Sequence, residues 1–112
     1  MSLRIRQIVL AASDLDAAVA RFEREVALHV IYGDPDVGKF GLSNVLMSIG
    51  DQFLEIVTPT RPDTAAGRHL DRHGESAYML ILQTDDLARA RVRLERMGVR
   101  IVWESATCFS IG

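Results

Sequence analysis

The chain has 112 residues and a formal net charge of −2, from 13 basic and 15 acidic side chains. This length fits one domain, and the charge balance, with no run of Lys or Arg, argues against nucleic-acid binding. The single cysteine, Cys108, excludes an intrachain disulfide framework and a zinc site built from cysteines. Apolar stretches are shorter than the roughly 20 residues that span a bilayer, and no signal peptide is recognisable at the start. We therefore expect a soluble, cytoplasmic domain without nucleic-acid or membrane partners. Lys39 is the only lysine, so the other basic side chains are arginines. This preference for arginine is typical of a GC-rich bacterial genome.

The first half of the chain predicts a strand, a helix and three further strands. An apolar run begins at Gln7, and Ser13 or Asp14 can cap the helix that follows. The helix carries an apolar stripe formed by Leu15, Ala18, Val19, Phe22 and Val26. The next strand candidates are Val30–Gly33, Leu42–Ile49 and Phe53–Val57. Gly50 and Asp51 form a compact turn, so the last two strands should pair antiparallel. A β-α-β-β-β module is expected at about residues 4–58.

The second half predicts a connection and a shorter module. Residues 59–75 are rich in Pro, Gly, Thr, Arg and Asp and read as a connection, with a short helix at Ala65–His73. Residues 76–104 predict a strand, a helix capped by Asp85 or Asp86, and a strand at Val102. Residues 105–112 are too few for two more strands. The second module is therefore expected to be incomplete; the alternative is a shortened form of a longer chain.

An internal repeat relates the two halves. At an offset of 72 residues, Asp14-Leu15 falls on Asp86-Leu87, and Phe22 falls on Leu94. In each half, the pattern predicts a strand, then a helix with a capping residue, then another strand. With its small polar turn Ser13–Ala18 and the central Glu55 of its last strand, the chain resembles the vicinal oxygen chelate superfamily, which includes glyoxalase I, bleomycin-resistance proteins, extradiol dioxygenases and methylmalonyl-CoA epimerase. The resemblance covers residues 4 to about 104. It implies an α+β fold of paired βαβββ modules, with sheets curling around one concave pocket.

The resemblance also implies where a divalent metal ion would bind. Family members place one ligand on the first and one on the fourth strand of each module, and Gln7 and Glu55 occupy these positions in the first module. In the second module, the repeat places Met79, a poor ligand for such ions, at the third ligand position. The fourth ligand would fall at about position 127. Tyr78, next to Met79, is expected on the opposite face of its strand. Glu55 lies in an apolar strand, so we expect it to face the concave side and to have a charged partner.

Other candidates for chemistry are interpreted as structural. His69 and His73 are four residues apart and would face the same way on a helix, but no zinc-protease motif accompanies them. His29 matches no ligand position, and Cys108 has no histidine near it in sequence. The arginines of the second helix are interpreted as a solvated face beside Asp85, Asp86 and Glu95, in preference to an anion site; they are Arg89, Arg91, Arg93 and Arg96.

Two functions are compatible with these observations. The first is a small-molecule-binding protein of the bleomycin-resistance kind without a complete metal site; its expected pocket residues are Phe40, Val45, Met47, Phe53, Met79 and Trp103. The alternative is a metal-dependent lyase, epimerase or dioxygenase-like enzyme, in which Gln7 and Glu55 are ligands and Glu55 is the base. An incomplete sheet would leave an unpaired edge and an uncovered apolar face. A homodimer with a pocket near the interface is therefore expected.

Overall fold

One mixed seven-stranded sheet organises the computed structural model, which describes residues 2–111. The elements in chain order are β1 (Leu3–Ala11), α1 (Leu15–Val26), β2 (Val30–Tyr32), the 3-10 helix η1 (Pro35–Phe40), β3 (Leu42–Ile49), β4 (Gln52–Pro59), α2 (Ala65–His73), β5 (Ser76–Thr84), α3 (Leu87–Arg96), β6 (Trp103–Glu104) and β7 (Cys108–Ile111). The strand order is β2-β3-β4-β1-β5-β7-β6. The fold is α+β, as the sequence predicts.

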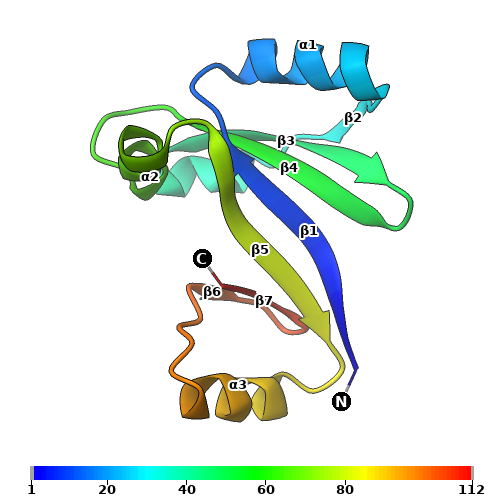
Figure 1. Cartoon of the computed structure of the whole chain (residues 1–112), viewed down its shortest axis with the longest axis vertical. Helices are drawn as coiled ribbons and strands as arrows, with labels where there is room; N and C mark the ends of the chain where they lie inside the picture. The colour runs from blue at the N-terminus through cyan, green and yellow to red at the C-terminus, as the bar shows by residue number, and fades with distance from the viewer. Residues whose placement is uncertain (1, 112) are drawn as a thin grey trace.

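The two halves of the chain meet at the centre of the sheet. There β1 pairs in parallel with β4 on one side and antiparallel with β5 on the other. Figure 1 shows α1 next to the β3–β4 part of the sheet and α3 at the opposite end, beside β5, β6 and β7. The long strands β1 and β5 connect these two parts.

The helices begin where the sequence places their caps. The Asp14 side chain accepts a hydrogen bond from the backbone N–H of Ala17 at 3.1 Å, and the Asp86 side chain accepts one from the N–H of Arg89 at 3.0 Å. These bonds satisfy N–H groups that have no partner within the helix. The short helix expected at Ala65–His73 is α2, with Thr64 as its cap.

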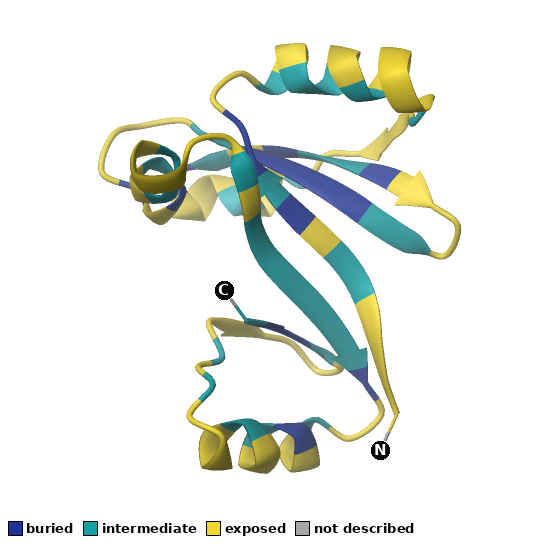
Figure 2. Ribbon diagram, viewed as in Figure 1, coloured by how far each residue is buried: buried dark blue, intermediate teal, exposed yellow. Residues whose placement is uncertain are grey.

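Alternation along the strands divides the core between the two faces of the sheet. On one face, α1 covers a cluster of buried residues that includes Met47, Leu54 and Ile56. On the other face, Val9, Ala11 and Val57 form a second buried cluster, contacted by partly buried side chains of Leu42, Leu70, Tyr78, Met79 and Ile81. We call this second side the Glu55 face, because β4 alternation places Glu55 with Val57. Buried positions are concentrated on β1, β3, β4 and β7, while the outer sides of the helices are exposed (Figure 2).

Two parts of the chain form elements that the sequence patterns did not predict. Residues Cys108–Ile111 form strand β7, which pairs with β5; residues 105–112 were expected to be too few for two strands, and those described contain this one. At the 72-residue offset, positions 108–111 correspond to 36–39, which lie in η1. The repeat therefore predicts no strand there. Residues Pro35–Phe40, between the second and third expected strands, form η1, with Pro35 in its first turn. Within residues 2–111, no helix is both long and apolar enough to cross a membrane.

Candidate functional site

A buried carboxyl group held by two amides lies on the Glu55 face. Gln7 Nε2 donates a hydrogen bond to Glu55 Oε1 at 2.6 Å, and Asn44 Nδ2 donates one to Glu55 Oε2 at 2.7 Å. Glu55 and Asn44 are each 7% exposed. We refer to Gln7, Asn44 and Glu55 as the amide–carboxyl centre.

Strand register brings the three side chains together. Gln7 on β1 is opposite Phe53, and Asn44 on β3 is opposite Val57. Glu55 lies between these two positions on β4, so all three side chains point to the same side of the sheet. The centre thus depends on the parallel pairing of β1 with β4 and on the hairpin between β3 and β4.

The orientation of the Asn44 amide is determined by a further contact. Its Oδ1 accepts a hydrogen bond from the backbone N–H of Asp34 at 2.9 Å, just before η1. An amide oxygen accepts and an amide nitrogen donates, so the contact with Asp34 directs Nδ2 toward Glu55. Within residues 2–111, the Gln7 side chain makes one hydrogen bond, to Glu55, so its amide is less constrained than that of Asn44.

The environment of Glu55 favours its protonated form. Burial raises the pKa of Glu55, the hydrogen bonds from Asn44 and Gln7 oppose this effect, and the negative charge of Asp34 raises the pKa further. Two neutral amides supply the hydrogen-bond donors to Glu55, and within residues 2–111 no charged side chain forms an ion pair with it. The position of Glu55, buried and in contact with Gln7, agrees with the expectation from sequence.

The described residues supply only part of a divalent metal site. Glu55 can offer a carboxylate oxygen, and Gln7 can offer its carbonyl oxygen if the amide rotates. The repeat position Met79 carries a thioether and packs against the Val9 cluster. Hard divalent ions usually take six or more oxygen ligands, and within residues 2–111 no group of three or more His, Cys, Asp or Glu side chains could hold a metal ion. These residues do not fit a complete metal centre.

Tyr78 lies where simple alternation does not place it. The pairing of β5 with β1 is shifted by a β-bulge, because Met79 is opposite Val9 while Ala77 is opposite Leu10. As a result, Tyr78 packs against the same buried cluster as Met79. The expectation that these two side chains lie on opposite faces is therefore wrong.

The six expected pocket residues are divided between different parts of the molecule. Val45 and Met47 are opposite Ile56 and Leu54 and belong to the core under α1, on the other face of the sheet from Glu55. Phe53 is opposite Gln7, and Met79 is opposite Val9. Both lie on the Glu55 face.

The other two expected pocket residues, Trp103 and Phe40, are more exposed than these four. Across the sheet, Gln7 is opposite Ile81, Ile81 is opposite Ser110, and Ser110 is opposite Trp103. Trp103 therefore lies on the same side of the sheet as Gln7 and Glu55. Phe40 ends η1 and is 53% exposed. Two grooves, of about 530 and 540 Å³, lie beside α3 and α1, and neither is lined by Gln7 or Glu55.

Two of the three histidines form a small cluster on α2. The rings of His69 and His73 lie on one side of α2 with their centroids 5.0 Å apart. His69 Nε2 is 2.9 Å from Ser76 Oγ, and its ring contacts the edge of Tyr78. These contacts connect α2 with the start of β5.

Asn44 is a residue that the sequence interpretation missed, although a signal for it existed. A two-residue turn at Gly50 and Asp51 pairs Ile49 with Gln52 and, counting back along the hairpin, Leu46 with Glu55. Alternation then places Asn44 on the same face as Glu55, and Val45 and Met47 on the other face. Had the hairpin register been applied, the predicted pocket would have included Asn44 in place of the core residues Val45 and Met47.

Comparison with solved structures finds similar folds among epimerases. A methylmalonyl-CoA epimerase in complex with methylmalonyl-CoA and NH4+ is 28% identical, with a TM-score of 0.79 over 91% of this chain and 75% of that chain. A variant of Streptomyces coelicolor methylmalonyl-CoA epimerase in complex with 2-nitronate-propionyl-CoA is 27% identical, with a TM-score of 0.78 over 92% and 78% of the two chains. A hypothetical protein from Bacillus halodurans shares the fold at 14% identity, with a TM-score of 0.81 over 92% of this chain and 74% of that one.

Sequence comparison identifies the family. No curated protein matches the chain significantly. The profile of the glyoxalase-like domain, however, matches residues 8–108, which include Asn44 and Glu55. The chain therefore belongs to the glyoxalase-like domain family, within the vicinal oxygen chelate superfamily.

Proposed function

We propose that this chain binds a small organic acid or acyl thioester, with the ligand's carbonyl group at the amide–carboxyl centre. The observation that carries the proposal is the hydrogen-bonded cluster of Gln7, Asn44 and Glu55 on one face of the sheet. Buried polar groups that converge on one point of a largely apolar surface are typical of ligand sites. Two similar solved structures of 27–28% identity are complexes with methylmalonyl-CoA and with 2-nitronate-propionyl-CoA, which supports a thioester as the first ligand to test.

Each group of the centre has a defined task in this proposal. The Gln7 amide rotates away from Glu55 and donates a hydrogen bond to the ligand's carbonyl oxygen. Asn44 keeps the Glu55 carboxyl in place, because Asp34 fixes its orientation. Glu55 itself accepts or donates a hydrogen bond according to its protonation. Phe53, Met79 and Trp103 are the proposed apolar contacts on the same side.

A second candidate function is proton transfer at the carbon next to the carbonyl, as in an epimerase. The similarity to methylmalonyl-CoA epimerases favours it, and burial raises the pKa of Glu55, which makes its carboxylate a stronger base than an exposed one. In this case the Glu55 carboxylate removes the proton, and Gln7 donates to the oxygen of the resulting enolate. The centre contains one carboxyl, which is sufficient for proton exchange; inversion also requires a donor on the opposite side of the carbon.

Calorimetry with methylmalonyl-CoA tests the binding proposal. We expect the wild type to bind and Glu55→Gln to bind at least about tenfold more weakly, which corresponds to about 1.4 kcal/mol. Ser43→Ala, an exposed position next to Asn44 on β3, is the matched control and should bind like the wild type. Equal affinity of wild type and Glu55→Gln would contradict the proposal.

Proton exchange in D2O distinguishes the two functions. Loss of the C2 proton signal of methylmalonyl-CoA, followed by NMR, is expected only if the protein acts as a proton-transfer enzyme. If exchange occurs, it should disappear in Glu55→Gln. Dialysis against EDTA beforehand adds a second distinction: binding through the amides persists, whereas a metal-dependent activity is lost.

A further inference from the structure

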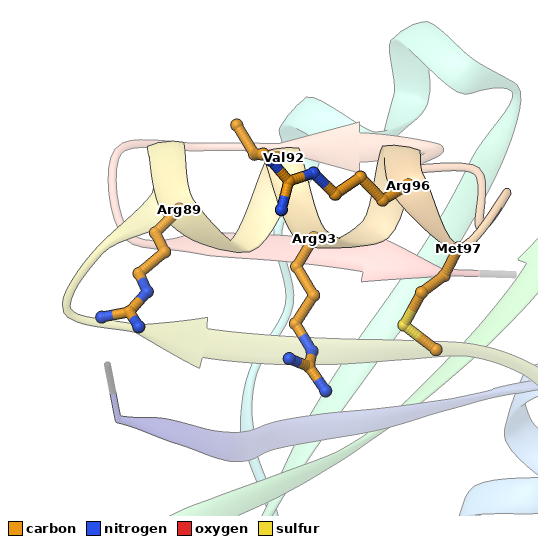
Figure 3. A pocket seen from close by; sticks show the side chains of 5 residues that line it. All are labelled: Arg89, Val92, Arg93, Arg96 and Met97. Carbon is orange, nitrogen blue, oxygen red and sulfur yellow. The ribbon is translucent and has the colours of Figure 1, made fainter.

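A groove with unpaired positive charge runs along one flank of α3. It has a volume of about 530 Å³ and is lined by Arg89, Val92, Arg93, Arg96 and Met97. Figure 3 shows Arg89, Arg93 and Met97 extending to the same side of the helix. Val92 is 48% and Met97 is 65% exposed, so apolar and cationic surfaces lie next to each other.

Two of the three acidic residues expected beside these arginines, Asp85 and Asp86, make other contacts. The Asp85 carboxylate accepts a hydrogen bond from the backbone N–H of Ser2, and Asp86 caps the first turn of α3. Glu104 pairs with Arg91, which does not line the groove. Within residues 2–111, Arg89, Arg93 and Arg96 form no ion pair. The guanidinium groups of Arg89 and Arg93 thus extend to one side of α3, and the Arg96 side chain, which also lines the groove, runs toward Val92 (Figure 3).

This combination suits a particular class of ligand. Guanidinium groups bind phosphate oxygens through paired hydrogen bonds, and several of them can share a diphosphate. The flexible side chain of Met97 and the exposed Val92 can contact an apolar or aromatic body attached to the phosphate. The volume of the groove is within the range of small-molecule sites, about 300–1,000 Å³.

We propose that the α3 flank binds the phosphate groups of an organic phosphate, such as a nucleoside diphosphate, with Arg89, Arg93 and Arg96 as the phosphate contacts and Val92 and Met97 as the apolar contacts. The site is distinct from the amide–carboxyl centre, because α3 lies beside β5 and β7 while Glu55 lies on β4 (Figure 1). It does not depend on the function proposed for Glu55.

Titration of the full chain with ADP and with inorganic pyrophosphate tests this proposal. We expect both to bind, more weakly as the salt concentration rises. The double variant Arg93→Gln/Arg96→Gln should lose at least about tenfold in affinity for both, or about 1.4 kcal/mol. Arg72→Gln, an exposed arginine on α2, is the matched control and should bind like the wild type. Circular dichroism verifies that all variants are folded.

A second variant separates the apolar contact from the charge. Met97→Ser should weaken ADP binding and leave pyrophosphate binding unchanged. Vesicles of phosphatidylcholine with and without phosphatidylglycerol provide the comparison with a lipid headgroup. Binding to the anionic vesicles without binding to ADP would overturn the proposal, as would equal ADP affinity in the wild type and in Arg93→Gln/Arg96→Gln.

Discussion

Glu55 is a buried ionisable residue whose partners are neutral. Burial raises its pKa above the ordinary value of 4.5, so the folded protein holds the Glu55 proton more tightly than the unfolded chain does. The stability contributed by this proton is fully present below the unfolded pKa and is lost as the pH rises through the folded pKa. Above that point the ionised carboxylate remains buried with two amide donors only.

Replacing Glu55 by Gln should remove this dependence on pH. We expect the free energy of unfolding of the wild type, relative to Glu55→Gln, to decrease as the pH rises from the unfolded pKa through the folded one, and then to level off. Urea denaturation of both proteins between about pH 4 and pH 8 measures the difference. Parallel stability curves would show that Glu55 does not titrate differently in the folded state.

Asn44 connects Glu55 with the backbone of Asp34, and its loss should be costly. Asn44→Ala leaves the buried Oε2 of Glu55 and the N–H of Asp34 without this partner, a change that usually costs about 1–3 kcal/mol. Denaturation at neutral pH measures the loss, and Ser43→Ala on the same strand should be within about 0.5 kcal/mol of the wild type. A similarly small effect of both variants would indicate that the amide does not support the carboxyl.

At the scale of elements, the junction between η1 and β3 depends on a glycine. Gly41 has φ +71°, and an added Cβ would lie 2.7 Å from Thr64 Cγ2 and 2.9 Å from Arg61 Cζ. The left-handed conformation alone costs about 1–2 kcal/mol for a residue with a side chain. Because β3 carries Asn44, a shift at this junction would also disturb the amide–carboxyl centre.

The substitution Gly41→Ala should therefore lower the free energy of unfolding by more than about 1 kcal/mol. Gly38→Ala, in the middle of η1, is the control, since its added Cβ would meet nothing within 4 Å. Thermal or urea denaturation compares the two variants. Equal stability of Gly41→Ala and Gly38→Ala would contradict the assignment of strain to Gly41.

The elements differ in how well sequence patterns could predict them. Local signals predicted β3 at Leu42–Ile49 and α2 at Ala65–His73, because turn residues and helix caps mark their ends. Strand β7 depends on pairing with β5, more than 20 residues earlier, and no local signal encodes it. The bulge at Tyr78 is similarly a property of the pairing between β1 and β5. Glu55 and Gln7 were identifiable from the family pattern, whereas Asn44 required the hairpin register.

At the scale of the whole molecule, apolar surface remains uncovered. Leu3, Ile5 and Ile8 on β1 are 52%, 41% and 41% exposed. The radius of gyration is 14.6 Å, compared with roughly 13 Å for a compact domain of this length. Exposed apolar surface on a central strand favours association with a second copy of the chain.

We therefore expect a homodimer in solution. Sedimentation velocity at micromolar concentration should give a mass of twice 12.4 kDa. The variant Ile5→Ser/Ile8→Ser should shift the equilibrium toward the monomer if β1 lies in the interface. A wild-type protein that remains a monomer throughout this concentration range would contradict the dimer.

The claim that the amide–carboxyl centre contacts the ligand is tested most directly by NMR of the side-chain amides. In a titration with methylmalonyl-CoA, the NH2 signals of Gln7 and Asn44, assigned by comparison with Gln7→Leu and Asn44→Ala, should shift in proportion to occupancy. The exposed Gln52 amide, which donates to the backbone carbonyl of Ile5 at 2.9 Å, is an internal reference and should shift much less. Saturable binding that leaves the Gln7 and Asn44 signals unchanged would contradict the assignment of the ligand site to Glu55.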